Sequence, residues 1–592
     1  MTTVRIVFLL LPTLALAAAC SRSPAKVASS TGGSSAGGQA AGGTSSAQDA
    51  GTSSGSGGSG NGGSTTQPGM GGATGGSGLG GGTSSAAGVG GSVPLGAGGT
   101  TGLGTGGSTR IGTGGFGGVS TGGNPGYGGA AGGETSSGGT TGAGGTTATG
   151  GIAGGATGTT GTGGAVGTGG GAGGGVTLSL DKTKQTMDGF GINDTWAEQS
   201  LPEQVFTTTG GGIGLSILRV GMGSDGKPMT SSALLSDIAT AKANGVTTII
   251  GTLWSGPNSC KSNNHTGGGH LLASCYESWA TTVAAFAKDN GLSAMSIQNE
   301  PDYCGNSDTG DCSDNYPTML YTADELVAFL KVVGPKLQAL SPPVKVIAPE
   351  TSEWLHLWTN NSATGSKDPL GGKYDYGHAL YKDAEAWGLV DIVGTHQYET
   401  QVAEPWPNDV PDMKTVWMTE MSGIKGWPEQ GPSSDIKNGV AVAGWIHDAI
   451  VNGMASAWLW WWYKPPTAGA NDNEGLVLSD GTDTKRHYTL GNFSRFIRPG
   501  YARVDVTGAI PSDLLLSAYK GSDGTVVVVA INKGTSAIEV PIGISGGTAP
   551  TSLVPWLTSA SDNLKSQTAV SVSDGSFTAT LAGMTVTTFV GK

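Results

Sequence analysis

The stretch Ser293-Ala-Met-Ser-Ile-Gln-Asn-Glu-Pro-Asp302 decides the fold that we expect for this chain. Its first half has the apolar character of a short strand, and it ends in polar residues and a proline. Because Pro301 cannot donate a hydrogen bond to a sheet, the strand should end with Glu300 at its tip. In parallel α/β folds, the C-terminal ends of strands face the edge where ligands bind. The stretch therefore predicts a parallel α/β fold with Glu300 at the mouth of a ligand site.

A second stretch, Thr415-Val-Trp-Met-Thr-Glu-Met-Ser422, repeats this pattern and places Glu420 at another strand tip. Two carboxyl groups at one mouth are typical of glycosidases, in which one protonates the leaving oxygen and the other attacks or stabilises the sugar. We assign Glu300 as general acid/base and Glu420 as nucleophile. A single strand-end glutamate is usually a solvated loop residue, but two in such contexts favour catalysis.

Strand and helix patterns alternate downstream of the first strand, which indicates βαβ units and a parallel sheet. The predicted helices include 278–290, 323–340, 376–387 and 438–452. The predicted strands are 189–191, 216–220, 247–254, 293–300, 344–350, 392–398, 415–420 and 455–463. Eight strands favour an α/β fold of the (β/α)8 TIM-barrel type. The alternative is an open doubly wound sheet. The sequence disfavours it, because no Gly-x-Gly-x-x-Gly turn follows the first predicted strand.

The pattern changes after residue 500 to short runs of period two, separated by Gly, Ser and Asp. The runs are 514–520, 525–532, 537–542, 552–558, 569–572 and 584–590. They predict a fused C-terminal antiparallel β-sandwich over 501–592, after a catalytic barrel over 176–500. The strand-like residues 176–184 are candidates to join the sandwich.

The front of the chain has a different character. Residues 1–20 have the layout of a signal peptide, with Arg5, an apolar run and small residues before Cys20. Lipidation at Cys20 would make an outer-membrane lipoprotein, and cleavage after Ala19 would release the protein. Residues 21–175 are a Gly-, Ser- and Thr-rich linker that cannot bury enough apolar surface to fold, so we expect a disordered tether.

Charge and cysteine usage narrow the class further. The net charge of −13 argues against nucleic acid as a partner. Four cysteines follow Cys20, and in an exported chain they predict disulfides, for which we favour one bond within each loop. The pairs are Cys260 with Cys275 and Cys304 with Cys312. The competing interpretation is a four-cysteine zinc site, which the spacing disfavours.

Other strand-end residues complete the predicted site. Arg219 could keep the nucleophile ionised, or form a structural ion pair. His396 and Tyr398 end one strand, and we expect His396 to hold Glu420 by hydrogen bonds rather than to bind a metal.

Aromatic side chains supply apolar surfaces on which sugar rings stack. Trp254 and either Trp461 or Trp462 are the candidates, because strand alternation turns at least one of the consecutive tryptophans away from the mouth. Tyr303 and Lys464 are further candidates for substrate contact. We expect no metal ion and no cofactor.

The motifs that carry this chemistry resemble glycoside hydrolase family 30, closest to its bacterial xylanase subfamily 8. The matching segments are Asp188-Gly-Phe-Gly191, Ser216-Ile-Leu-Arg219, Ser296-Ile-Gln-Asn-Glu-Pro-Asp-Tyr303, Gly394-Thr-His396, Trp417-Met-Thr-Glu420, Trp461-Trp-Tyr463, Asn492-Phe-Ser-Arg-Phe-Ile-Arg-Pro-Gly-Tyr501, Ser517-Ala-Tyr-Lys520 and Val529-Ala-Ile-Asn-Lys533. The resemblance covers 176–592 and none of the tether.

The resemblance implies a barrel with a fused sandwich and a retaining endo-β-1,4-xylanase. It places the acid/base on Glu300, the nucleophile on Glu420, a contact to the sugar 2-hydroxyl on Asn299 and ring stacking on Trp254. Members that require a glucuronic acid branch carry an arginine shortly after the Trp-Trp-Tyr, where this chain has Lys464. Lysine lacks the bidentate fork, so we do not expect glucuronate dependence.

Two alternatives stay open from the sequence. One is another family 30 activity, such as an endo-β-1,6-galactanase or a β-1,6-glucanase. The other is a surface-tethered carbohydrate-binding protein without turnover, which the presence of both glutamates disfavours. We expect a monomeric, exported protein whose partner is a xylan-like polysaccharide and whose contact with a membrane is limited to the lipid at Cys20.

Overall fold

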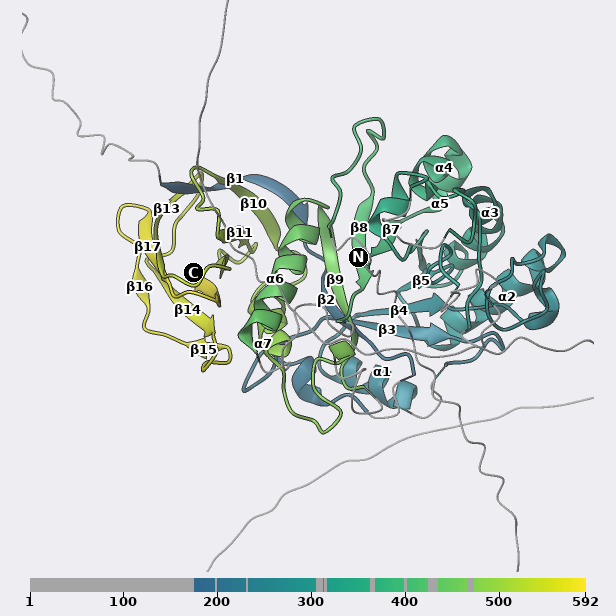
Figure 1. Cartoon of the computed structure of the whole chain (residues 1–592), viewed down its shortest axis with the longest axis horizontal. Coiled ribbons are helices and arrows are strands. Elements are labelled where there is room, and N and C mark those ends of the chain that lie inside the picture. The colour runs from purple at the N-terminus through teal and green to yellow at the C-terminus, as the bar shows by residue number, and fades with distance from the viewer. Residues whose placement is uncertain are drawn as a thin grey trace, which may run out of the picture. The chain divides into compact units, whose positions relative to one another are not determined.

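The computed structural model describes residues 175–592 except 197–199, 230–232, 305–311, 313–316, 362–367, 399–401, 424–434 and 466–472. The expected signal peptide, the tether and Cys20 lie outside the described residues. Eight parallel strands close into a barrel, so the predicted (β/α)8 architecture is confirmed (Figure 1). These strands are β2 (Gly189–Asn193), β3 (Ile217–Met222), β4 (Thr248–Leu253), β5 (Ala294–Ser296), β6 (Lys345–Ile347), β7 (Ile392–His396), β8 (Thr415–Glu420) and β9 (Ala455–Trp462).

Apolar side chains fill the inside of the barrel. The buried cluster takes residues from seven of the eight strands, namely Ile217, Ile250, Ala294, Ile347, Ile392, Trp417, Ala457 and Leu459. The remaining strand contributes Gly191, where a Cβ would come within 2.7 Å of the Ile217 carbonyl oxygen. The barrel is therefore a packed core, and a ligand site has to lie at one of its ends.

Helices cover the outside of the barrel. They are α1 (Ala233–Ala243), α2 (Tyr276–Asp289), α3 (Ala323–Gln338), α4 (Tyr376–Lys382), α5 (Ala384–Leu389), α6 (Ile436–Val451) and α7 (Lys485–Ser494). The single helix predicted over 376–387 is wrong, because Asp383 has an extended backbone and splits it into α4 and α5. The Asp383 side chain caps α5 by accepting hydrogen bonds from the amides of Glu385 and Ala386.

The C-terminal strands form one ten-stranded sheet that runs in the order β15-β14-β18-β12-β11-β10-β1-β13-β17, with β16 paired to β14. Its strands are β1 (Val176–Thr186), β10 (Ala502–Thr507), β11 (Leu514–Lys520), β12 (Val526–Asn532), β13 (Ile538–Ser545), β14 (Ser552–Thr558), β15 (Lys565–Ser566), β16 (Val570–Ser571), β17 (Ser576–Leu581) and β18 (Thr585–Gly591). The predicted antiparallel sheet is confirmed, with one parallel pair where β1 joins β13.

Strand β12 shows how the sheet is held to the barrel. All seven of its residues are buried. Val527, Val529 and Ile531 belong to the main core of the barrel, whereas Val526 and Val528 face a separate core within the sheet. Because side chains alternate between the two faces of a strand, β12 contributes to both cores. Helices α6 and α7 lie between the barrel strands and the sheet (Figure 1).

Helix α7 was not predicted from the sequence. Most of its buried residues are polar, so its sequence lacks the repeat of apolar residues that indicates an amphipathic helix. Its Asn492 is fully buried and joins the two parts. The Asn492 amide nitrogen donates to the Trp556 carbonyl oxygen at 2.9 Å, and its amide oxygen accepts from the Thr558 hydroxyl at 2.6 Å. The Thr588 hydroxyl donates to the Asn492 carbonyl oxygen at 2.7 Å.

Two disulfides brace the loops that follow β4 and β5. They join Cys260 to Cys275 and Cys304 to Cys312, which is the pairing that the sequence suggested. Within the described part of the chain, no helix combines the length and the apolar character that crossing a bilayer requires.

We expect Asn492→Ala to lower the free energy of unfolding by about 1–3 kcal/mol, because it leaves buried hydrogen-bonding groups on β14 unpaired. Urea denaturation followed by tryptophan fluorescence measures the change. The exposed Asn361 supplies the control, Asn361→Ala, which should be neutral. Equal stability of both variants would show that Asn492 does not join the sheet to the barrel.

Candidate active site

Glu300 reaches the mouth of the barrel through a backbone kink. Strand β5 ends at Ser296, earlier than predicted, and the chain continues between its neighbours through backbone hydrogen bonds. The Glu300 amide donates to the Glu350 carbonyl oxygen at 2.9 Å. Glu300 then has a φ of 45°, which non-glycine residues rarely adopt. Such strain, held in place by its surroundings, is characteristic of functional sites.

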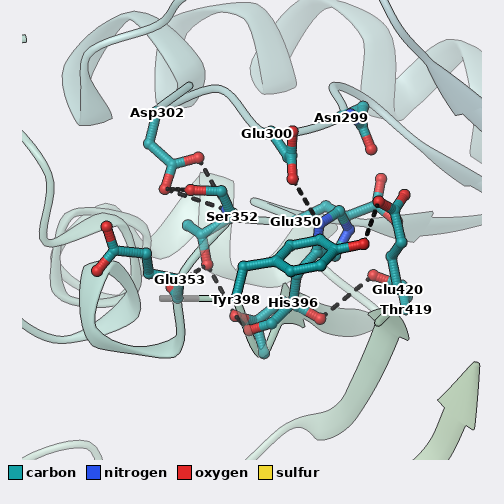
Figure 2. A network of polar contacts seen from close by, with 12 residues as sticks. Asn299, Glu300, Asp302, Glu350, Ser352, Glu353, His396, Tyr398, Thr419 and Glu420 are labelled. Carbon is teal, nitrogen blue, oxygen red and sulfur yellow. Dashed lines mark hydrogen bonds and ion pairs between the residues drawn. The ribbon is translucent and has the colours of Figure 1, made fainter. Parts of the chain in front are cut away.

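Glu420 is the last residue of β8 and is 4% exposed. The guanidinium of Arg219 donates to its Oε2 at 2.7 Å, and the hydroxyl of Tyr398 donates to its Oε1 at 3.1 Å. Both carboxyl oxygens therefore accept a hydrogen bond from a buried side chain, which fixes the orientation of the carboxyl group. Figure 2 shows the contact from Tyr398.

Arg219, from β3, is fully buried and connects several strand ends. Besides Glu420 it donates to the Asn299 side-chain oxygen at 2.6 Å and to Glu350 Oε1 at 3.2 Å. The ring of Trp254 lies 4.8 Å from its guanidinium carbon. One cation thus contacts two carboxylates, an amide and an aromatic face.

The two predicted catalytic glutamates come together. A carboxyl oxygen of Glu300, one of Glu420 and a ring nitrogen of His396 all lie within 4.8 Å of one another. The prediction that His396 holds Glu420 is wrong. His396 Nδ1 instead lies 3.1 Å from Glu300 Oε1.

The surroundings give the two carboxyl groups different proton affinities. Burial and the charge of Glu420 raise the pKa of Glu300 well above its usual range. Burial also raises the pKa of Glu420, to about 7, but Arg219 and Tyr398 limit this rise. Burial and Arg219 lower the pKa of His396 well below its usual range, so its imidazole is neutral. Hydrogen bonds from Arg219 and Tyr398 thus favour the ionised form of Glu420, whereas burial and the neighbouring negative charges favour the protonated form of Glu300.

Sequence reasoning missed a third glutamate. Glu350 follows β6, is fully buried, has a φ of 62° and forms an ion pair with Arg219. Its charge raises the pKa of both Glu300 and Glu420. The signal was present, because a proline and a strand-end glutamate also close the segment over 344–350.

Asp302 was missed as well, although it lies only two residues beyond Glu300. Its carboxylate accepts hydrogen bonds from the amide and hydroxyl of Ser352 (Figure 2). It also lies 2.6 Å from His356 Nδ1. This buried charge contributes to the raised pKa of Glu300.

The predicted stacking tryptophans form one buried cluster. Trp254, Trp461 and Trp462 pack together, and the partly buried Trp196 and Tyr303 pack against them. Both Trp461 and Trp462 join this cluster, because a register shift between β2 and β9 interrupts the strict alternation. Contact of Trp254, and of Trp461 or Trp462, with a sugar ring stays a prediction.

Lys464 follows β9 and is partly exposed. Its contact with substrate also stays a prediction. The atoms of Glu300, His396 and Glu420 are close enough to hold a cation. The positive charge of Arg219, which lies 2.7 Å from Glu420, would repel a cation bound at this place.

A closed barrel with two buried carboxyl groups facing each other at the strand ends defines a glycosidase-type site. Comparison with known proteins agrees with this class. Residues 502–589 match the family model described as the glycosyl hydrolase family 30 beta sandwich domain. Over 442 residues, the chain is 30% identical to Glucuronoxylanase XynC of Bacillus subtilis (strain 168), covering 70% of this chain and 91% of that protein.

Two solved structures of family 30 enzymes are also similar to this chain. A family 30 endoxylanase from Clostridium papyrosolvens C71 superposes with a TM-score of 0.56 at 29% identity. A family 30 subfamily 8 xylanase from Clostridium acetobutylicum superposes with a TM-score of 0.58, also at 29% identity. Each match covers 70% of this chain and 99% of the other. The chain belongs to glycoside hydrolase family 30, and it is a glycoside hydrolase.

We expect Arg219→Met to lower the free energy of unfolding by about 3–5 kcal/mol, because it leaves buried carboxyl groups without their cation. The loss should be larger at pH 8 than at pH 5. Without the cation the folded-state pKa of Glu420 rises further above its unfolded value, so stability falls as pH increases.

Urea denaturation at the two pH values measures this loss. Lys437→Met, an exposed cation replaced on α6, is the control and should be neutral at both. A loss that does not depend on pH would contradict the electrostatic role of Arg219.

Proposed function

We propose that this glycoside hydrolase is a retaining endo-β-1,4-xylanase that acts by double displacement. The observation that carries the proposal is the close approach of Glu300 and Glu420, whose carboxyl oxygens lie within 4.8 Å. Carboxyl separations of about 5–5.5 Å are typical of retaining enzymes, whereas inverting enzymes need room for a water molecule.

The chemistry follows from the two proton affinities. In the first step the Glu420 carboxylate attacks the anomeric carbon, while Glu300 donates its proton to the departing glycosidic oxygen. In the second step Glu300 takes a proton from water, and that water displaces Glu420 from the same carbon. Arg219 and Tyr398, which contact Glu420, stabilise its carboxylate before attack and after release. Asn299, held by Arg219, is placed to contact the sugar hydroxyl beside the reacting carbon.

The substrate class rests on the relatives. Family members that are similar to this chain in sequence or structure carry the names glucuronoxylanase and endoxylanase. A family 30 enzyme for another backbone, such as a β-1,6-glucan or β-1,6-galactan, is the second candidate. A solved endo-β-1,6-glucanase shares the fold, with a TM-score of 0.53 at 18% identity. Because Lys464 replaces an arginine, we propose that a glucuronate branch is not required.

The proposed location is extracellular or at the cell surface. It rests on the signal-peptide layout of residues 1–20 and on Cys20 as the candidate lipid attachment site. The Gly-rich residues 21–175 would then be the tether between that anchor and the enzyme.

Product analysis on unsubstituted xylan, glucuronoxylan, β-1,6-glucan and β-1,6-galactan tests the function. We expect xylo-oligosaccharides from both xylans, with similar rates per bond. Products from the 1,6-linked polymers alone would replace the xylanase proposal by the second candidate.

Glu420→Ala should lower kcat more than about a thousandfold while leaving oligosaccharide binding largely intact.

Glu300→Gln should be slow on xylan but far less impaired on an aryl xyloside with a good leaving group, because such a leaving group needs no proton. The matched control is Glu420→Gln, which should be inactive on both substrates. The ratio of kcat/KM on the two substrates is the measurement, because kcat/KM reports the first step, whereas the second step needs Glu300 as a base on either substrate. Equal impairment of Glu300→Gln on both would contradict the acid role of Glu300.

The pH dependence of kcat/KM should be bell-shaped. On the acidic side activity rises as Glu420 loses its proton, around its pKa of about 7. On the alkaline side activity falls as Glu300 loses the proton that it must donate, at a pH well above the usual range of a carboxyl group. With a good leaving group, Glu300→Gln should remove the alkaline limb and keep the acidic one. A profile of Glu300→Gln that retains both limbs would contradict this assignment.

A further inference from the structure

The short turn that carries Glu300 is anchored at two points on the loop that follows β6. At the first point, the Glu300 amide donates to the Glu350 carbonyl oxygen at 2.9 Å. At the second point, the Asp302 carboxylate accepts hydrogen bonds from the Ser352 amide at 2.9 Å and the Ser352 hydroxyl at 2.8 Å (Figure 2). The Tyr303 amide closes the turn by donating to the Glu300 carbonyl oxygen at 3.1 Å. The unusual backbone of Glu300 is therefore fixed by contacts on both sides of the residue.

His356 adds a third contact to the second anchor. Its Nδ1 lies 2.6 Å from Asp302 Oδ2, and the two residues are only 2% and 3% exposed. The imidazole stacks on the ring of Tyr374, with centroids 3.8 Å apart and planes 9° apart. The Tyr374 hydroxyl in turn donates to Asp368 Oδ1 at 2.7 Å. Stacking thus fixes the orientation of the imidazole that contacts Asp302.

The surroundings of His356 favour its charged form. Burial disfavours that charge, but the hydrogen bond and charge of Asp302, together with the charges of Glu353 and Asp368, raise the pKa of His356 above its usual value. His356 and Asp302 therefore form a buried ion pair. Removing one member of such a pair leaves the other charge uncompensated in surroundings that screen it poorly.

Glu300 is surrounded by groups that can carry a charge. Besides Asp302, the ionisable side chains that act on Glu300 come from four strands or the loops after them, and they are Arg219, Glu350, His396, Tyr398 and Glu420. Arg219 pairs with Glu350 and Glu420, whereas His356 pairs with Asp302. Losing the charge of either Asp302 or His356 therefore changes the net charge beside Glu300 by one unit, and the two losses have opposite signs.

We propose that the Asp302–His356 ion pair positions Glu300 and balances the charge around it, so that both members are positioning residues for the acid/base step. The proposal rests on the proposed glycosidase function and adds two residues to it. Negative charge favours the protonated form of a carboxyl group, so the two members act in opposite directions on the alkaline limit of activity.

The pH dependence of kcat/KM for linear xylohexaose, measured with the purified full-length enzyme, tests the charge of the pair. Asp302→Asn removes the negative charge, so the alkaline midpoint should move to lower pH by about one unit. His356→Asn keeps a donor near the place of Nδ1 but removes the positive charge, so the midpoint should move to higher pH by a similar amount. The double variant Asp302→Asn/His356→Asn should return it close to the wild-type value. The acidic midpoint, which belongs to Glu420, should not move.

His378→Asn is the matched control. His378 forms a similar pair with Asp375 at the start of α4, with 2.5 Å between Nδ1 and Oδ1, and its replacement should leave both midpoints unchanged. Melting temperatures identify the variants that are folded. Alkaline midpoints that stay in place, or that move in the same direction in Asp302→Asn and His356→Asn, would overturn the proposal.

Ser352→Ala tests the positioning without a change of charge, and it carries the test if a single charge variant fails to fold. It removes one hydrogen bond to Asp302 and keeps the one from the backbone amide. We expect kcat/KM to fall about threefold to tenfold on xylohexaose, which needs the proton of Glu300, but less than about twofold on an aryl xyloside with a good leaving group.

Equal losses of Ser352→Ala on the two substrates, or no loss on either, would contradict the positioning role. In each of these cases wild-type turnover of xylohexaose leaves the proposed function standing, whereas its absence in the wild type would remove the function itself.

Discussion

The structure of the site depends on one buried cation. Arg219 is fully buried, and its guanidinium contacts Glu350, Glu420 and Asn299, which come from three different barrel strands or the loops that follow them. Burying a carboxylate without a partner is prohibitively costly, so this one side chain makes several ionisable groups at one mouth possible. Arg219 also makes the surroundings of the two glutamates different. Glu420 accepts a hydrogen bond from the cation, whereas Glu300 contacts the neutral imidazole of His396.

The C-terminal sheet contributes to the site through α7. At one point of this helix, Asn492 hydrogen-bonds to β14 and β18. At another point, Arg486 donates from Nε to the Gly475 carbonyl oxygen at 2.6 Å and so contacts the segment that follows β9. The family-like segment 492–501 thus begins with a residue that contacts the sheet. Helix α7 therefore links the sheet to the segment that follows β9.

The barrel and both catalytic candidates could be predicted because they follow from strong local signals. Strand-like and helical segments alternate along the chain, and polar residues stand at the strand ends that carry Glu300 and Glu420. The partner of His396 depends on which strand ends meet in the closed barrel. Trp461 and Trp462 share one cluster beside a register shift between β2 and β9, and a sequence does not reveal such a shift. Helix α7 had no apolar period because its polar residues are buried against two partners. Glu350 had a signal, but its importance emerges only from its contact with Arg219.

The central claim is that Glu420 forms a bond to the sugar while Glu300 handles the proton. Trapping with an activated 2-deoxy-2-fluoro xylobioside, followed by peptide mass mapping, tests it most directly, because the fluorine slows the second step and the covalent intermediate accumulates. The account predicts one label per enzyme molecule, on the peptide that contains Glu420. A label on another carboxylate, or no label under conditions in which natural substrate is turned over, would contradict it.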